Sequence, residues 1–160
     1  MILGGQVVSV IGIDPGETVG ISFLDYVGNR LTGTMQVQVD AASSVALLEA
    51  LLKSYYGSPE AVKQRWGAVE DFVVSNRPGT KGDAAATTRH QAFILAETLQ
   101  MWGYHVSKRK KADVSPWATD KMLSAAGLLR EPTGMRHAND ASRHALYCAV
   151  HDSYKPNPLR

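Results

Sequence analysis

The sequence has few of the residues that cross-link a fold through disulfides or metal clusters, and no long apolar run of the kind that spans a membrane. Its single cysteine, Cys148, excludes an intramolecular disulfide and a cysteine-based zinc cluster. No stretch approaches the roughly 20 apolar residues that span a bilayer, and no basic region followed by an apolar signal core opens the chain. We therefore expect a soluble cytoplasmic protein with no membrane partner. Cys148 lies on an apolar helix face, which favours a packed side chain over a nucleophile.

Net charge is also small, at +2, and by itself does not indicate a nucleic-acid partner. The distribution of charge is more informative. Residues 1–80 carry 5 Lys and Arg against 8 Asp and Glu, whereas residues 81–160 carry 12 against 7. The cluster Lys108, Arg109, Lys110 and Lys111 is the densest part of this basic half, and a positive surface of this kind neutralises phosphates.

The length of 160 residues suits one domain, 1–160, with a sizeable core. Apolar residues make up 44% of the chain and charged residues 20%, which is a globular composition. The hydrophobic patterns predict strands at 7–13, 19–26, 31–39, 67–74 and 104–108, and helices at 41–56, 84–102, 116–125 and 138–153. The third of these helices is predicted from Ser115 as its cap and Pro116 as its first residue. This order fits an α/β fold, a mixed five-stranded sheet flanked by helices.

Three acidic residues lie in or directly after predicted strands or helices that are far apart in the sequence. Asp14 ends an apolar strand in the turn Ile11-Gly-Ile-Asp-Pro-Gly-Glu-Thr-Val-Gly20, Glu70 lies in the apolar strand 67–74, and Asp140 lies on the final helix. A half-buried carboxylate needs a cation or a hydrogen-bond donor to offset desolvation. Three of them together predict a divalent-metal site. Because Mg²⁺ and Mn²⁺ prefer oxygen ligands, we expect one of these metals.

The ordered set resembles the RuvC family of Holliday-junction resolvases, in the ribonuclease H-like superfamily. The resemblance rests on the "GIDPG…G" turn, on Ala68-Val-Glu70 and on a final pair three residues apart, here His137 and Asp140. It implies a ribonuclease H-like fold. It also implies that Asp14, Glu70, His137 and Asp140 are catalytic metal ligands in a two-metal site that hydrolyses phosphodiester bonds.

Other residues near this set are weaker candidates. His144 is one helical turn beyond Asp140 on the same face and is a candidate proton carrier. Glu17 lies in the first turn, where an exposed position is the simpler interpretation. Asp71 follows Glu70 in an extended strand, so we expect its side chain on the opposite face of the sheet.

Contacts to DNA are expected from Arg77 and Lys81, in the loop after the Glu70 strand, and from the cluster at 108–111. The family often carries an aromatic residue in this loop, and this chain has none between Ser75 and Asp83. Strict junction selectivity is therefore less expected than action on branched DNA in general, including forks and flaps. The resemblance places the protein in the cytoplasm of a bacterial cell or a phage-infected host.

The helix 84–102 carries more apolar surface than one face needs, because Phe93, Ile94 and Met101 widen the stripe that packs on the sheet. The excess predicts a homodimer through this helix, and the resemblance implies the same. Three alternatives remain. The first is a ribonuclease H acting on RNA–DNA hybrids, and the second is a non-catalytic DNA-binding dimer. The third, an actin-like nucleotide-binding domain, usually needs a duplicated domain and a second phosphate turn, and this sequence contains neither.

Overall fold

The structure is a computed structural model that describes residues 6–55, 64–72, 82–131 and 133–160. Five strands form one mixed sheet in the order β3-β2-β1-β4-β5. The antiparallel part consists of β1 (Val7–Asp14), β2 (Thr18–Val27) and β3 (Arg30–Asp40). The strands β4 (Gln64–Glu70) and β5 (His105–Arg109) add to β1 in parallel. Because β1, β4 and β5 are parallel, Asp14, Glu70 and Arg109 end at the same edge of the sheet.

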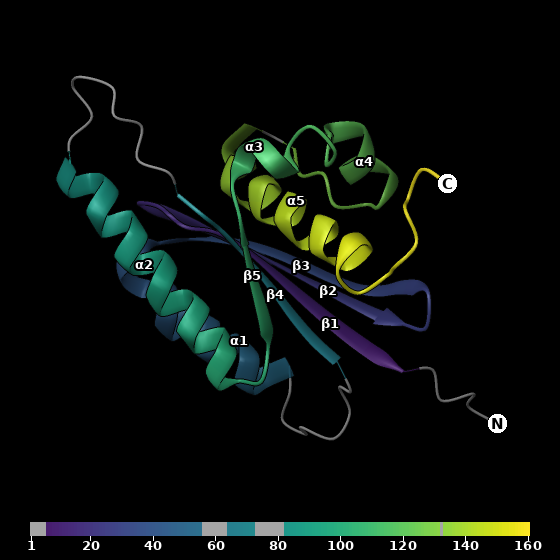
Figure 1. The fold of residues 1–160 in the computed structure, drawn as a ribbon, viewed down its shortest axis with the longest axis horizontal. Coiled ribbons are helices and arrows are strands. Elements are labelled where there is room, and N and C mark those ends of the chain that lie inside the picture. The colour runs from purple at the N-terminus through teal and green to yellow at the C-terminus, as the bar shows by residue number, and fades with distance from the viewer. Residues whose placement is uncertain (1–5, 56–63, 73–81, 132) are drawn as a thin grey trace.

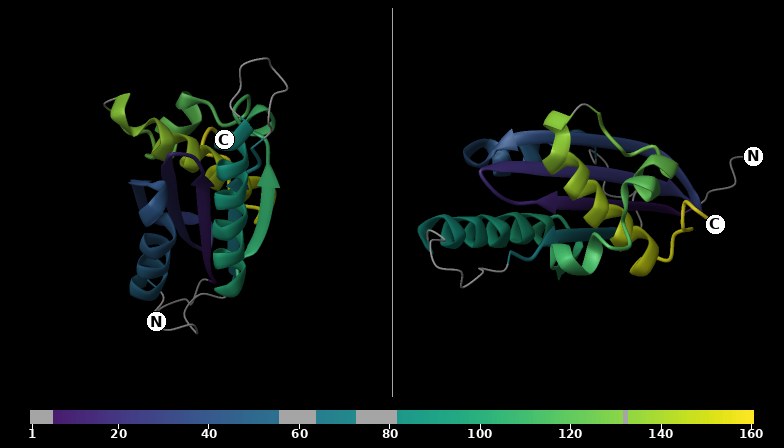
Figure 2. Two further views of the ribbon diagram at one scale, coloured as in Figure 1. Left: turned by 90° about the vertical axis from the view of Figure 1, so that its left-hand side faces the viewer. Right: turned by 90° about the horizontal axis from the view of Figure 1, so that it is seen from above.

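Helices cover both faces of this sheet (Figures 1 and 2). One face carries α1 (Ser44–Tyr55), which follows the short helix η1 (Ala41–Ser43), and α2 (Gly82–Met101). The other face carries α5 (Arg136–His151), with α3 (Lys111–Val114) and α4 (Asp120–Ala125) beside it, and η2 (Thr133–Met135) leads into α5. No helix in the described ranges is long and apolar enough to cross a membrane.

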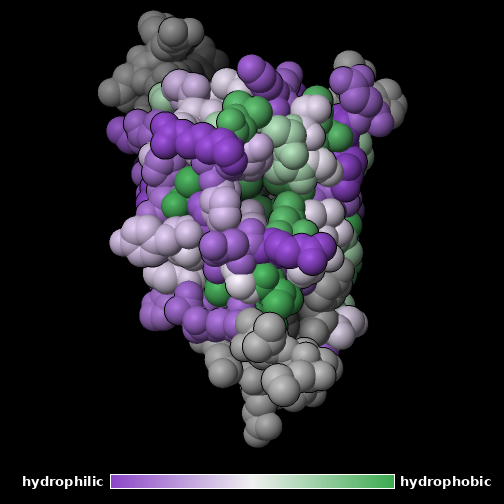
Figure 3. All heavy atoms as spheres, turned by 90° about the vertical axis from the view of Figure 1, so that its right-hand side faces the viewer, coloured by the Kyte–Doolittle hydropathy of each residue, from purple (hydrophilic) through white to green (hydrophobic). Residues whose placement is uncertain are grey.

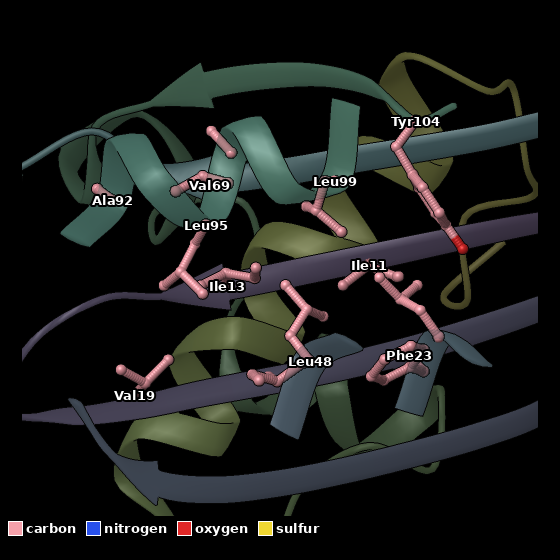
Figure 4. Packing of buried hydrophobic residues seen from close by; sticks show 13 residues of the cluster. Ile11, Ile13, Val19, Phe23, Leu48, Val69, Ala92, Leu95, Leu99 and Tyr104 are labelled. Atoms are coloured by element: carbon pink, nitrogen blue, oxygen red, sulfur yellow. The ribbon is translucent and has the colours of Figure 1, made fainter. Parts of the chain in front are cut away.

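Alternate residues of the central strands supply the two halves of the core. Ile11, Ile13 and Val69 face α1 and α2, where they pack with Leu48, Leu95 and their neighbours (Figure 4). The strand residues Val8, Val10 and Ala68 face α5 and α4. Each fully buried Leu or Ile side chain contributes roughly 1.5–3 kcal/mol. The same alternation puts Asp14 and Glu70 on the α5 face, because they lie an even number of residues from Val10 and Ala68.

Two glycines allow α5 to lie directly on the sheet backbone. A Cβ atom at Gly12 would collide with the backbone oxygen of Ala141, and one at Gly20 would collide with that of His137. The helix presents the small residues Ala138, Ala141 and Ala145 to this contact, all of them fully buried. Together the two glycines set the distance between α5 and the sheet edge that carries Asp14.

The predicted fold class is confirmed, and so is the position of each strand to within a few residues. The strand predicted at 67–74 begins earlier, at Gln64, and is assigned to Glu70, while residues 73 and 74 lie outside the described part of the chain. Asp71 therefore follows the strand instead of lying within it, and its side chain is exposed.

The helix predicted at 116–125 is wrong in its first four residues. Ser115 closes α3 by donating its backbone N–H to the Lys111 carbonyl oxygen, so it does not cap a following helix. Thr119 is the true cap, because its side chain accepts a hydrogen bond from the Met122 N–H. The break between the two short helices leaves α4 to begin at Asp120, where it faces α5.

The end of the molecule that carries the first residues of β1 and the C-terminal segment lies away from the edge with Asp14 (Figure 1). Hydrophilic residues dominate the part of this surface visible in Figure 3, and the hydrophobic residues there form small separate groups. The more exposed large apolar side chains include Phe93 and Met101 on α2.

Candidate metal centre

The sheet edge and α5 bring together the three predicted acids. Asp14 ends β1, Glu70 ends β4, and Asp140 lies on the second turn of α5. Asp14 and Asp140 are 6% and 7% exposed, and the side chain of Glu70 is 12% exposed. Each acid therefore gives up most of its hydration, which a carboxylate does at high cost unless a cation or donors compensate it.

Each of these carboxylates has a partner from the protein. His137 Nδ1 lies 2.8 Å from Asp14 Oδ2, and the Lys111 ammonium donates to Asp140 Oδ2 at 2.6 Å. His144 Nε2 lies 3.3 Å from Glu70 Oε2. Glu70 Oε2 is buried and accepts no hydrogen bond of normal geometry from any residue that the structure describes. An oxygen of this kind has a lone pair available for a ligand.

The acids lie close enough together to perturb one another's ionisation. Burial, and then the nearby charges of Glu70 and Asp140, raise the pKa of Asp14 from 3.8 to about 8, although Lys111 offsets part of the rise. Burial also acts to raise the pKa of Glu70, but the contact with His144 and the charge of Lys111 outweigh it and leave this pKa below its usual value. Without a metal, the cluster therefore favours an ionised Glu70 beside a protonated Asp14.

The chemistry of these side chains fits a hard divalent cation, which carboxylate oxygens bind best. However, side chains of the protein already contact each of these carboxylates: Lys111, His137 and His144. Among the residues described, no three His, Cys, Asp or Glu side chains are placed so that they hold one metal ion. The Lys111 ammonium is in contact with Asp140 and influences the other two acids, so it supplies positive charge to the cluster. A metal ion would take over this role.

A set of hydrogen bonds fixes the elements around the cluster. Gln91 on α2 accepts from the Gly16 N–H at 3.1 Å and donates to the Ala41 carbonyl oxygen at 3.2 Å, which ties the turn after Asp14 to η1. Gln38 on β3 accepts from the Ala138 N–H at 3.0 Å and donates to the Gly134 oxygen at 2.8 Å. Sequence analysis missed both glutamines, because neither has a local motif and their partners are 50 to 100 residues away.

The remaining predicted residues have different surroundings. Lys108 and Lys110 are exposed near the same edge, and the Lys108 ammonium lies over the Phe93 ring. Arg109 donates from both terminal nitrogens to Asp152, at 2.7 and 2.6 Å, and also contacts Ser107, so its guanidinium is engaged within the protein. Glu17 is exposed, as expected. The predicted DNA contacts Arg77 and Lys81 lie outside the described residues.

Comparison with solved structures gives the fold a known counterpart. RuvC of T. thermophilus in complex with a Holliday junction substrate matches with a TM-score of 0.59 and 19% identity, over 91% of this chain and 95% of that one. A further Thermus thermophilus RuvC structure matches with a TM-score of 0.56, the same identity and the same coverage. In sequence comparisons, no family model and no curated protein matches the chain. The likeness at this identity establishes a RuvC-like fold.

Proposed function

We propose that the protein is a metal-dependent endonuclease that hydrolyses phosphodiester bonds in Holliday junctions and in other branched DNA such as forks and flaps. The observation that supports this most strongly is the convergence of Asp14, Glu70 and Asp140, from β1, β4 and α5, into one cluster in which Glu70 and Asp140 both act on the ionisation of Asp14. This cluster occurs on a fold that resembles that of a RuvC protein whose structure was solved in complex with a Holliday junction substrate. The activity itself is the proposal.

In this proposal Asp14, Glu70, His137 and Asp140 hold Mg²⁺ or Mn²⁺, with two ions per site. Such a pair activates a water and stabilises the charge on the leaving oxygen of an in-line displacement. Asp14 must lose its proton for this role, and the charge of the ions would compensate the burial and the repulsion that raise its pKa. His137 orients Asp14 through their 2.8 Å contact.

Two further side chains have roles within the proposal. His144 faces Glu70 from α5 and is 2% exposed, so it orients that carboxylate and is placed to pass a proton to it or from it. Lys111 compensates the acids when no metal is bound and contacts substrate phosphate when it is released from Asp140. With Lys108 and Lys110 it forms the cationic part of the DNA-binding surface.

The second structural support is the surface of α2. Phe93 is 49% exposed and Met101 is 85% exposed, while Ala92, Leu95 and Leu99 on the same helix pack into the core. We propose that α2 pairs with its copy in a homodimer. Two copies related by a two-fold axis would present two sites to a four-way junction. A monomer would favour a ribonuclease H acting on a hybrid duplex.

The test is cleavage of labelled four-way junction, fork, flap, linear duplex and RNA–DNA hybrid with Mg²⁺, Mn²⁺ or chelator. Metal-dependent paired nicks in the junction, absent from Asp14→Asn and Glu70→Gln, would support the proposal, and both variants should still bind the junction. Glu17→Gln is the matched control, since it removes an exposed acid from the same turn. Cleavage of the hybrid alone would indicate ribonuclease H, and binding without cleavage would indicate a non-catalytic DNA-binding protein.

A further inference from the structure

A cavity of about 310 Å³ opens beside the acidic cluster. Its wall includes Asp140, so the cavity borders the candidate metal centre at that residue. The other lining residues come from the start of α4, from the segment at 129–131 and from α5. A volume near 300 Å³ is at the lower end of the range of small-ligand sites, and is adequate for one nucleotide unit.

The wall of the cavity presents several guanidinium groups along one line of α5. Arg136, Asp140 and Arg143 are four and three residues apart, so they lie on one face of that helix. Arg130 lines the same cavity from the segment after α4. Asn139 holds this segment against α5, because its side chain accepts from the Arg130 N–H at 2.9 Å and donates to the Arg130 carbonyl oxygen at 3.0 Å. The position of the Arg130 backbone is therefore fixed.

Arg143 provides the most specific observation. Its side chain is 17% exposed, its Nη2 pairs with Asp120, and its Nε lies 3.7 Å from Asp140 Oδ1. Its Nη1 is buried and has no hydrogen-bond partner among the residues that the structure describes. A buried donor without an acceptor is unfavourable, and an anionic oxygen in the cavity would satisfy it.

Three acids line this wall beside the three arginines, and two of these acids are already engaged in ion pairs. Asp120 is paired with Arg143, and Asp140 is paired with Lys111. Glu131 is exposed, whereas the guanidinium of Arg143 is mostly buried. The lining contains one large apolar side chain, Leu129, and no aromatic ring among the described residues. A stacked base needs a flat apolar or aromatic surface, so this wall suits a phosphate better.

We infer that this cavity binds a backbone phosphate of the DNA strand, next to the phosphate held at the acidic cluster. Arg143 Nη1 and Arg136 donate to its oxygens. This inference rests on the proposed function and adds a second phosphate position to it. Because Arg143 also faces Asp140, a phosphate in the cavity fixes the carboxylate that borders both positions. Arg143 thus links strand binding to the geometry of the metal centre.

The experiment uses junctions in which single phosphates around the mapped cut are replaced, one at a time, by uncharged methylphosphonates. With the wild-type protein, neutralising one phosphate adjacent to the cut should slow cleavage by about tenfold, as expected when a charge-assisted contact is lost. Arg136→Gln and Arg143→Lys should be slower on unmodified junction and should lose nothing further at that position. Arg136→Gln should also reduce the slope of log affinity against log salt by about one, whereas Arg143→Lys keeps its positive charge and should leave that slope nearly unchanged.

The matched control is Arg30→Gln, which neutralises an exposed arginine at the first residue of β3, at the end of the sheet away from Asp14. Its cleavage should be slowed by the same methylphosphonate replacements that slow the wild type, an effect called interference below. Arg136 is exposed, so its replacement is expected to fold even if Arg143→Lys does not. Interference that is equal in wild type and Arg136→Gln, or absent at every position, would overturn the inference.

Failure of the proposed function gives a different result. If wild-type protein cuts none of the unmodified substrates, the same methylphosphonate series is measured by junction binding in chelator. Interference at one phosphate that disappears in Arg136→Gln would then support the cavity as a phosphate site in a non-catalytic DNA-binding protein. Binding that is insensitive to every replacement would reject the site as well.

Discussion

Replacement of Asp14 by asparagine is expected to stabilise the metal-free protein and to abolish cleavage. Asp14 is buried next to Glu70 and Asp140, and these surroundings raise its pKa from 3.8 to about 8. The folded protein thus keeps a proton on Asp14 that the unfolded chain releases near pH 4. Wild-type stability is therefore greatest at low pH as far as this group is concerned, and declines as pH rises from about 4 to about 8. Asparagine carries no charge to desolvate and avoids this decline.

The magnitude follows from the same shift. At about 1.36 kcal/mol per pKa unit, the rise sets an upper limit of roughly 6 kcal/mol at pH above 8. Relaxation of the cluster and entry of water reduce the real cost of a buried charge, so we expect an observed gain of about 1–3 kcal/mol for Asp14→Asn. For a chain of this length that corresponds to roughly 3–10 °C in Tm. The difference between variant and wild type should be smallest near pH 4 and largest at pH 8–9.

The assay is thermal unfolding of both proteins in chelator across this pH range, repeated with Mg²⁺ or Mn²⁺. Metal at about 100 times its Kd should stabilise the wild type by about 2.7 kcal/mol and the variant by much less, which would reverse their order. Glu17→Gln should follow the wild type throughout. If Asp14→Asn melts below the wild type at pH 8 in chelator while Glu17→Gln does not, the acids do not repel one another as argued.

Three further predictions concern packing, assembly and metal affinity. Gly12→Ala should lower the free energy of unfolding by more than about 2 kcal/mol, measured by thermal unfolding, and should slow cleavage, because the new methyl group pushes α5 off the sheet. Gly33→Ala is the control and should change little, because a Cβ atom there meets nothing closer than 3.5 Å. Phe93→Glu combined with Met101→Glu should shift the protein to a monomer in analytical ultracentrifugation, and an unchanged mass would place any dimer contact elsewhere. Lys111→Gln should tighten Mn²⁺ binding several-fold in calorimetry, since the ammonium competes for Asp140 Oδ2, and weaker binding would contradict that competition.

The amino-acid sequence alone was sufficient to identify the three acids and the order of the elements. Asp14 and Glu70 each end an apolar run, and a parallel arrangement of those strands brings such ends to one edge. His137 and Asp140 share a helix face because of helical periodicity. The capping signal at Ser115 failed because another local hydrogen bond uses this residue: its N–H donates to the Lys111 carbonyl oxygen and closes α3.

Other features depend on contacts between residues distant in the chain, and only the tertiary structure decided them. Gly12 looks like an ordinary strand glycine until α5 lies against it, and Gln38 and Gln91 acquire roles only from partners far along the chain. The sequence grouped Arg109 with its basic neighbours, but Asp152, 43 residues away, binds it within the fold. Arg143 became notable because its Nη1 is buried beside a cavity. Sequence patterns report which chemistry is available, whereas the partner of each charged group is set by how the helices pack on the sheet.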